Sequence, residues 1–402
     1  MKIKIAILIN DFFFNNYETF YKLLKEKESI FDVKVLAVDG YNDKSKNSHA
    51  ISRFLKSINI DNIDTNKNNK LFNLEEYNPD YVFYLVPYDC YFKEEYSSEI
   101  VKNYSNVCTI SYGASMIKNE GLYESLKNNS FFENAKYVFV ETSYNLDFGS
   151  YTEKFIPIGY MKLDKYIYYN KMPSKKNKRT KILWKPRWTL DRDSNFFREI
   201  ENISKFIKHH KEVDFYVYYH PLFNQKIKEK NLEKEFTKIH TDLKTYENYF
   251  ECEYSTFLED VLSSDILISD HSSTLVEFAM TGKPMIYTKS NIKLNDLGNK
   301  IISNAYVSTS SNETINYLEE LLKGNDSKKE KRERCKNKYY FYPPGHESVS
   351  NYLVNYLLHD YELNKIHTLE KELAIKDEQI KKMNNNLKNK LQKLLKWGKI
   401  NM

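Results

Sequence analysis

Short apolar runs alternate with amphipathic stretches through the first part of the chain. Apolar runs of about four to eight residues between polar segments are typical of buried strands, and apolar positions three and four apart indicate helices. The pattern predicts strands at 3–9, 33–38, 81–86, 107–111, 136–141 and 154–158, and helices at 17–27 and 49–58. Such an alternation predicts a parallel sheet with crossover helices.

The same alternation resumes after a polar break. Residues 172–181, MPSKKNKRTK, are basic and lack apolar periodicity, so we interpret them as an interdomain linker. Beyond the linker, the pattern predicts strands at 182–184, 215–219, 266–269 and 285–288, and helices at 196–209 and 254–263. Two such halves predict two Rossmann-like domains that face a cleft, with ligands beyond the carboxyl ends of the strands.

The last part of the chain is helical in pattern from about residue 348. Its apolar residues follow a heptad-like spacing that Lys376 and Lys390 interrupt: Ile366, Leu369, Leu373, Ile380, Met383, Leu387 and Leu394. After Glu378 there is no acidic residue, and lysines accumulate around Trp397. We expect a helix outside both domain cores, which self-associates or adsorbs to an anionic inner membrane surface. A solvated, charged helix end is the alternative.

Length and charge limit the classes of protein. A chain of 402 residues suits about two domains plus an appendage. The net charge of +6 is modest and does not indicate a nucleic-acid partner, because anionic phosphates or a membrane surface would suit it equally well. No apolar run approaches the roughly 18 residues that span a bilayer, so we expect any membrane contact to be peripheral.

The cysteines and the first residues indicate a cytoplasmic protein. The four cysteines lie far apart without a Cys-x-x-Cys pair, so neither a zinc site nor a disulfide framework is predicted. The start, MKIKIAILIN, is apolar but short, and Asp11 follows it directly. We therefore interpret it as a first strand and not as a signal peptide.

The strongest candidate for chemistry is the sequence Ser269-Asp270-His271-Ser272-Ser273, between a predicted strand and a helix. Ser272 or Ser273 can cap the helix with its hydroxyl. Amides at a helix start, together with neighbouring hydroxyls, can bind an anion such as a diphosphate. Helix capping alone is the alternative.

A second candidate follows in the same helix, in the pattern Glu277-x-Ala279-x-x-Gly282-x-Pro284. Glu277 lies one turn beyond Ser273, so its carboxylate can accept hydrogen bonds from both ribose hydroxyls of a nucleotide. Ala279 permits close packing on the sheet, and Gly282 is expected to end the helix. A solvated helix residue is the alternative for Glu277.

The segment 266–287, ILISDHSSTLVEFAMTGKPMIY, resembles the CDP-glycerol glycerophosphotransferase family, whose members build teichoic-acid-type polymers. Three further segments resemble this family in the same order: 155–164 (FIPIGYMKLD), 182–189 (ILWKPRWT) and 219–222 (YHPL). The first of them has Met161 and Lys162 where the family has Pro and Arg. The resemblance spans about residues 107–302, and the Glu-x-Ala-x-x-Gly-x-Pro element is shared with many two-Rossmann glycosyltransferases.

The resemblance implies a GT-B-like α/β fold and a set of donor-binding residues. It divides the chain into an acceptor domain at 1–171, the linker at 172–181, a nucleotide-donor domain at 182–345 and a helical, basic tail at 346–402. The implied donor-binding residues are Arg187, His220, Ser269, Asp270, His271, Ser272, Ser273 and Glu277, with His220 and Asp270 as the catalytic candidates. Arg187 offers bidentate phosphate recognition, and a positively charged His220 would stabilise the departing nucleotide.

The acceptor side departs from the family. Where the family presents a His-Gly element with the presumed base, this chain has Tyr112-Gly113. Neutral Tyr, with an ordinary pKa of about 10, is a poor base at pH 7, so another group, another acceptor or another chemistry is implied. His271 stands where the family has an aromatic residue, and it is either a new base or an imidazole that fills the space.

The function implied is transfer of glycerol phosphate, or a related group, from a CDP-activated donor to a lipid-linked cell-surface polymer, with release of CMP. No cofactor or metal is demanded by the sequence. Two alternatives remain: a nucleotide-sugar-dependent glycosyltransferase of capsule or lipopolysaccharide synthesis, and a non-catalytic assembly partner. We expect a cytoplasmic protein that can lie on the inner face of the membrane.

Overall fold

The computed structural model describes most of the chain. The described residues are 2–12, 14, 16–40, 46–111, 113, 115–118, 130–141, 153–162, 164–165, 179–190, 195–220, 222–253, 257–335, 338, 342–344 and 348–400, with side chains described up to residue 393. Tyr112, most of the predicted linker and the side chain of Trp397 lie outside this set. The chain divides into two compact units, Met1–Ser350 and Asn351–Met402.

The first sheet of the larger unit is parallel throughout, in the order β3-β2-β1-β4-β5-β6-β7. Its strands are β1 (Ile3–Ile9), β2 (Phe31–Ala37), β3 (Ile63–Asp64), β4 (Tyr81–Tyr84), β5 (Asn106–Ile110), β6 (Tyr137–Val140) and β7 (Phe155–Pro157). Its helices are α1 (Glu18–Glu26), α2 (Ser48–Ser57), α3 (Leu74–Tyr77), α4 (Ser98–Val101), α6 (Phe131–Asn134) and the 3₁₀ turns η2 (Lys67–Asn69), η3 (Asp89–Tyr91) and η4 (Glu94–Tyr96). Side chains of β1 are buried on both faces, which explains its unbroken apolar run.

The second sheet is also parallel, in the order β10-β9-β8-β11-β12-β13. Its strands are β8 (Thr180–Lys185), β9 (Val213–Val217), β10 (Tyr249–Glu251), β11 (Ile266–Ser269), β12 (Met285–Thr288) and β13 (Tyr306–Ser308). Its helices are α8 (Phe196–His209), α9 (Phe223–Glu229), α10 (Glu233–Leu243), α11 (Phe257–Ser263), α12 (Ser273–Ala279), α13 (Asp296–Ile302), α14 (Ser311–Leu322) and α15 (Lys329–Cys335). Two parallel sheets with flanking helices confirm the predicted GT-B-like α/β class.

Buried aromatic side chains form much of the core beneath the second sheet. Trp184 of β8 is fully buried, and its ring stacks on that of Phe196 with centroids 5.4 Å apart. Phe196 begins α8, so this contact fixes the start of the helix against the central strand of the sheet. Asn202 of α8 also donates to the Ser311 hydroxyl at 2.9 Å, which joins α8 to α14.

The structure adds strands that the hydrophobic pattern did not predict. The additional strands, β3, β10 and β13, have two or three residues each and lie at sheet edges. An edge strand pairs on one side only and needs no long apolar run, so the sequence gives it a weak signal. In addition, β8 begins at Thr180, so the last two residues of the predicted linker belong to a strand.

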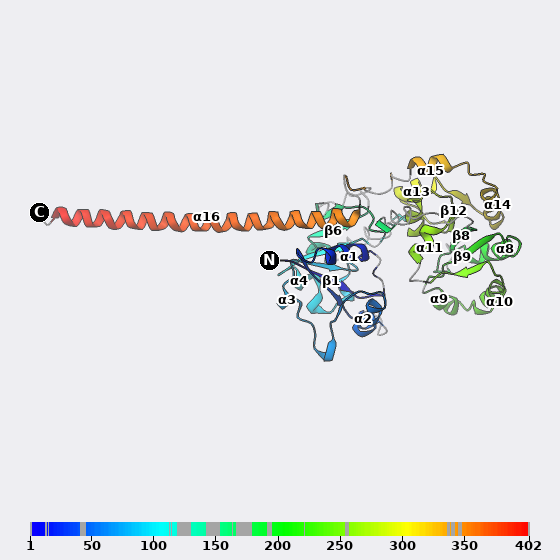
Figure 1. Cartoon of the computed structure of the whole chain (residues 1–402), viewed down its shortest axis with the longest axis horizontal. Helices are drawn as coiled ribbons and strands as arrows, with labels where there is room; N and C mark the ends of the chain where they lie inside the picture. Colours follow the sequence, from blue (N-terminus) through cyan, green and yellow to red (C-terminus); the bar gives the residue numbers. More distant parts are fainter. Residues whose placement is uncertain are drawn as a thin grey trace. The chain divides into compact units, whose positions relative to one another are not determined.

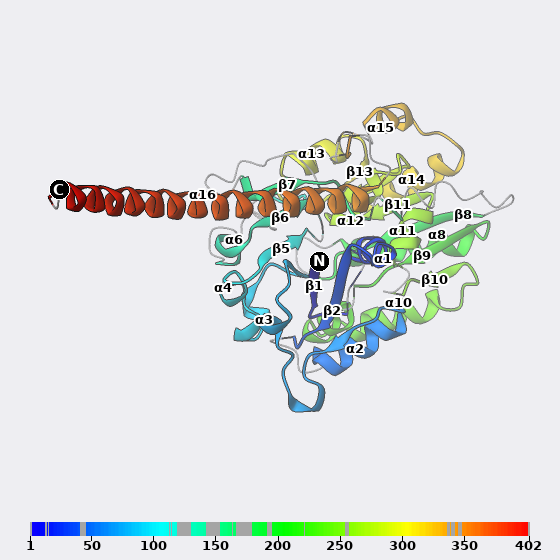
Figure 2. The same ribbon diagram turned by 60° about the vertical axis from the view of Figure 1, so that its left-hand side comes forward.

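The smaller unit belongs to one continuous helix, α16 (Val349–Ile400), seen along its length in Figures 1 and 2. Its first amides are capped within the larger unit, since Asp164 accepts from the Val349 and Ser350 amides at 2.7 and 3.0 Å. The heptad residues from Ile366 to Leu387 are at least half exposed. Among the described residues, no helix is long and apolar enough to cross a membrane.

Candidate functional site

The predicted donor segment begins where two central strands of the second sheet end together. Ser269 of β11 pairs in register with Lys185 of β8, and each is the last residue of its strand. The Ser269 side chain is buried, and its hydroxyl donates to the Lys185 carbonyl at 2.9 Å. This bond joins the carboxyl ends of the two strands.

Ser272 caps helix α12 and also contacts a lysine. Its side-chain oxygen accepts from the Thr274 amide at 3.2 Å, and the Lys185 ammonium donates to the same oxygen at 2.9 Å. Ser273, the first residue of the helix, is exposed. Gly282 follows the helix with a positive φ of 69°, in agreement with the predicted end of this element.

Three basic side chains, those of Lys185, Arg187 and His220, lie close together where β8 ends, and we call this region the basic corner. Burial lowers the pKa of Lys185 to about 8, although Glu277 and Asp270 oppose the shift. Burial, then Lys185 and Arg187, lower the pKa of His220 to about 4. A group whose pKa falls because of cations close to it lies in a strongly positive field. The corner therefore suits an anionic ligand.

His220 is held as a neutral ring. Its Nδ1 accepts from the Leu222 amide at 3.2 Å, which leaves the hydrogen on Nε2. The Trp188 ring stacks on it with centroids 5.1 Å apart. The sequence suggested a positively charged His220, whereas a pKa of about 4 gives a neutral donor at pH 7.

Asp270 makes its hydrogen bonds within the protein. Its buried carboxylate accepts from the Arg187 and Asn195 amides at 3.3 and 3.0 Å and from the Thr288 hydroxyl. Burial raises the pKa of this carboxyl. These bonds hold the backbone that follows β8, so Asp270 positions the residues around it. Its role as a catalytic candidate remains a prediction.

His271 is a buried residue that joins α12 to the segment after β12. Its side chain is 1% exposed, and its Nδ1 lies 3.0 Å from the Ser290 hydroxyl. This contact accounts for an imidazole that fills space in the core. Its assignment to the donor site remains a prediction.

Glu277 connects the two halves of the larger unit. It is 4% exposed, and its Oε1 accepts from the Tyr160 hydroxyl at 2.5 Å and from the Lys162 ammonium at 2.7 Å. Tyr160 and Lys162 follow β7 of the first sheet, so these bonds bring the domain-junction segment to α12. Its Oε2 is buried and has no hydrogen-bond partner among the described residues.

The acceptor-side candidates divide between described and undescribed residues. A Cβ added to Gly113 would lie 3.7 Å from the Ser273 Cβ and 4.0 Å from the Tyr160 hydroxyl. Gly113 of the predicted acceptor element therefore lies at the start of α12. Tyr112 lies outside the described residues.

Sequence reasoning missed the roles of Lys185, Tyr160 and Lys162. Lys185 was visible two residues before Arg187 at the end of a predicted strand. Tyr160 and Lys162 were part of a motif, but no local pattern relates them to Glu277, which is more than a hundred residues away in the chain. Lys162 occupies the position of the family's Arg and supplies a positive charge to the carboxylate.

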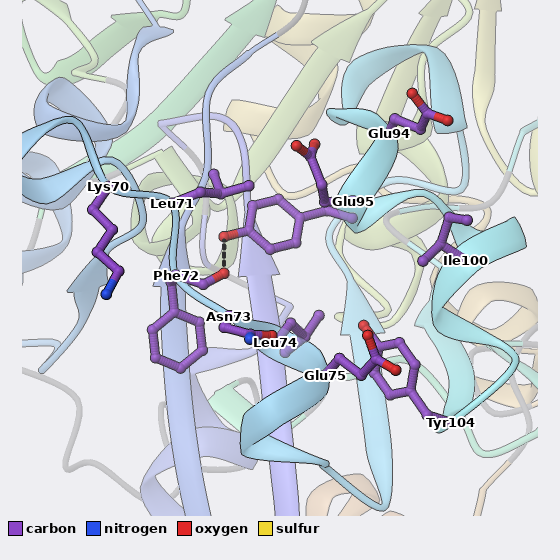
Figure 3. A pocket seen from close by; sticks show the side chains of 11 residues that line it. Lys70, Leu71, Phe72, Asn73, Leu74, Glu75, Glu94, Glu95, Ile100 and Tyr104 are labelled. Carbon is purple, nitrogen blue, oxygen red and sulfur yellow. Dashed lines mark hydrogen bonds between the residues drawn. The ribbon is translucent and has the colours of Figure 1, made fainter.

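A cavity of about 480 Å³ lies elsewhere, in the first domain (Figure 3). Its lining includes Phe72 and Tyr96, and the Tyr96 hydroxyl donates to the Phe72 carbonyl at 2.8 Å. Three acidic residues also line it: Glu75, Glu94 and Glu95. Lys70 is the one basic residue of the lining, so its acidic side chains outnumber its basic ones, and a diphosphate is favoured less here than at the basic corner.

The two Rossmann-like domains and the basic edge of the second sheet define a class, the GT-B-like proteins that bind an activated nucleotide donor. A match in sequence identifies the family. The chain belongs to the CDP-glycerol:poly(glycerophosphate) glycerophosphotransferase family, whose model matches residues 135–359, more than half of the chain. This match confirms the predicted family and the predicted transferase class.

Solved structures share the fold at low sequence identity. The wall teichoic acid polymerase TagF has 12% identity and a TM-score of 0.56, with 90% of this chain and 89% of that chain covered. UDP-GlcNAc 2-epimerase from Neisseria meningitidis bound to UDP-GlcNAc has 13% identity and a TM-score of 0.57, covering 89% and 100%. A glycosyltransferase from Rickettsia africae has 17% identity and a TM-score of 0.50, covering 90% and 98%. No curated protein matches the chain.

Proposed function

We propose that this protein transfers glycerol phosphate from CDP-glycerol to a hydroxyl at the end of a teichoic-acid-type polymer, with release of CMP. The observation that carries the proposal is the basic corner of Lys185, Arg187 and His220, with the Glu277 carboxylate on α12 nearby. A nucleotide diphosphate needs cationic or neutral N–H donors for its phosphates and an acceptor for its ribose hydroxyls. This corner offers both.

The donor's phosphates bind at the basic corner. The Lys185 ammonium and the Ser272 hydroxyl lie 2.9 Å apart and can contact the same phosphate oxygen. Arg187 adds a guanidinium, and neutral His220 donates from Nε2. Ser269, Asp270 and His271 support this arrangement from inside the fold, while Ser273 is exposed beside Gly113.

The ribose binds at Glu277. Its Oε2 is buried without a hydrogen-bond partner among the described residues, which costs about 1–3 kcal/mol unless a ligand supplies a donor. Two adjacent ribose hydroxyls are such donors. Tyr160 and Lys162 hold the other oxygen and fix the orientation of the carboxylate.

The reaction is a displacement at phosphorus. The acceptor oxygen attacks the phosphorus that carries the glycerol, a new P–O bond forms, and the bond to the bridging oxygen breaks. The bridging oxygen leaves with CMP, and Lys185, Arg187 and His220 stabilise its developing charge. The hydroxyl proton passes to a base on the acceptor side.

The test is a donor panel on purified full-length protein with a soluble glycerol-phosphate primer. We expect CMP release and primer elongation with CDP-glycerol, and neither product with UDP-sugars. UDP release with a sugar donor would replace this proposal with the glycosyltransferase alternative. Inactivity with every donor, together with donor binding that survives, would favour the non-catalytic partner.

The exposed heptad residues of α16 bear on how copies of this protein assemble. Acidic residues concentrate in its first half, whereas 381–399 carries only basic charges, so two antiparallel copies would align opposite charges. The exposed heptad residues would be buried between the copies. We propose antiparallel self-association through α16, and the lysine-rich end also suits an anionic membrane surface near a lipid-linked acceptor.

Paired substitutions separate these roles. Leu373 is 61% exposed on the heptad row, and Ile375 is 58% exposed off it, so Leu373→Ser and Ile375→Ser are matched. Light scattering of the full-length protein should show a smaller particle for Leu373→Ser only. Equal particle sizes would refute self-association. Sedimentation with vesicles, with and without anionic lipid, tests the membrane role against a chain that ends at Asp360.

A further inference from the structure

The acceptor side of this chain lacks the histidine that its family places there, yet an attacking hydroxyl must lose a proton. Tyr112 stands at that position in the sequence, and a tyrosine hydroxyl, with a pKa of about 10 in water, is a poor base. The structure places another candidate, Glu141, at the same edge of the first sheet. Glu141 follows β6 directly, and Ser111, the residue before Tyr112, follows the neighbouring strand β5.

Glu141 is a buried carboxyl group with an unmade hydrogen bond. It is 3% exposed, and its Oε2 has no hydrogen-bond partner among the described residues. The Ser111 side chain lies near enough to this carboxyl to lower its pKa. An orphaned, buried acceptor oxygen is costly, and the hydroxyl of a ligand is one donor that would satisfy it.

Glu141 is also connected to the donor site. The Lys162 ammonium is close enough to act on the Glu141 carboxyl, and it forms an ion pair with Glu277 at 2.7 Å. Gly113, two residues beyond Ser111, lies against Ser273 and Tyr160. The acceptor-side carboxyl and the ribose-side carboxyl thus both lie near one lysine, which connects Glu141 to the proposed donor site.

We infer that Glu141 is the general base of this enzyme and takes the proton of the attacking hydroxyl on Oε2. The inference rests on the proposed function. The acceptor oxygen forms its bond to phosphorus, its proton goes to Glu141, and the electron pair of the broken bond leaves with CMP. Glu141 then returns the proton to solvent before the next cycle.

The protonation chemistry agrees with this role. Burial raises the pKa of Glu141, while the Ser111 side chain, its own backbone amide and Lys162 partly oppose the shift. A carboxylate with a raised pKa is a stronger base than one in water, where the pKa of Glu is about 4.3. Lys162 in turn helps to keep the group ionised near pH 7.

A second orphaned oxygen indicates the class of acceptor. Asn16 is 1% exposed, and its amide nitrogen donates to the Ser111 carbonyl at 2.9 Å, while its Oδ1 has no partner among the described residues. Asn16 and Glu141 therefore each offer an unpaired acceptor oxygen, and both residues lie near Ser111. This pair suits an acceptor that ends in neighbouring hydroxyls, such as a terminal glycerol unit.

The test compares Glu141→Gln with a matched variant, Glu199→Gln. Glu199 is also a buried glutamate with a raised pKa and an unpaired oxygen, but it lies on α8 and contacts Arg198. We expect Glu141→Gln to lower kcat by about 10²- to 10⁴-fold, with CDP-glycerol affinity unchanged. Glu199→Gln should keep kcat within a few-fold per folded molecule.

The pH profile distinguishes a base from a structural residue. In the wild type, the acid limb of kcat/KM should lie above the ordinary range of Glu, and Glu141→Gln should lose this limb. Glu141→Asp, which keeps a carboxyl group, should retain part of the rate and the limb. Asn16→Ala should raise the KM for acceptors with a terminal diol and leave the limb in place.

Each outcome has a distinct meaning. If the wild type is active and Glu141→Gln binds donor, has wild-type kcat and keeps the limb, Glu141 is not the base and the proposed function stands. If Glu141→Gln does not fold, the Glu141→Asp variant decides the matter. Loss of its acid limb overturns the inference, and retention of the acid limb supports the inference. If the wild type itself transfers nothing from CDP-glycerol, the proposed function fails and this inference falls with it.

Discussion

Replacement of Lys185 tests the donor site most directly, because this lysine has both a defined contact and a shifted pKa. Its ammonium lies 2.9 Å from the Ser272 hydroxyl, and burial lowers its pKa to about 8. A charge-assisted hydrogen bond to a phosphate contributes about 1.5–3 kcal/mol. Lys185→Met should therefore weaken CDP-glycerol binding by roughly 10- to 150-fold at pH 7.

The same pKa predicts how binding depends on pH. With a pKa of about 8, about nine in ten Lys185 side chains are protonated at pH 7 and about one in ten at pH 9. The donor's negative charge stabilises the protonated form, so the Kd should rise about tenfold over that interval. Lys185→Arg remains charged at both pH values and should show no such rise from this position.

Stability provides the control against unfolding. The folded-state pKa of Lys185 lies below the ordinary 10.5, so folding disfavours its protonated form. This group therefore makes the protein more stable as pH rises from about 8 towards 10.5, and it destabilises the fold at pH 7. Lys185→Met should melt at the same temperature as the wild type at pH 7, or higher, while it binds donor more weakly.

The assay is calorimetric titration of CDP-glycerol from pH 7 to pH 9.5, with thermal melting of each variant. Two results would refute the assignment: a wild-type Kd that does not change over this range, or a Lys185→Met variant with the wild-type pH slope.

Three further predictions concern neighbouring residues. Glu277→Gln should break the buried ion pair with Lys162 and cost about 3–5 kcal/mol of stability by urea unfolding. Lys162→Met should largely restore this stability while CDP binding stays weak. His220→Ala should lower kcat more than a hundredfold, and His220→Gln should lower it less. Neither variant should lose a limb of the kcat/KM profile between pH 5.5 and 7, since the pKa of His220 is about 4. Asp270→Ala should lower the urea midpoint, because the Arg187 and Asn195 amides lose their acceptor at about 1–3 kcal/mol each. An unchanged midpoint would contradict its positioning role.

The central strands and long helices could be predicted because their signals are local. The strand at 3–9 and the helix at 196–209 match β1 and α8 to the residue, since a buried strand or an amphipathic helix carries its own periodicity. The three short edge strands were missed, because each depends on a neighbour's open edge more than on its own sequence.

The donor segment shows the same division. The turn between β11 and α12 and the cap on Ser272 follow from adjacent residues, so the motif predicted them. The neutral state of His220 could not be predicted, because it depends on burial and on two cations from a different loop. Asp270 likewise shows its internal role only through amides from the segment after β8.

The sequence by itself determined the class of fold, the family and the position of the donor segment, because repeated strands and helices and a contiguous motif are encoded within short stretches of chain. Only the tertiary structure decided which distant groups meet: Lys185 at Ser272, Lys162 and Tyr160 at Glu277, and Ser111 at Glu141. These contacts form across strands and between domains, where burial and neighbouring charges set each group's protonation. No local periodicity records that environment, so the chemistry of the site emerges only after the chain has folded.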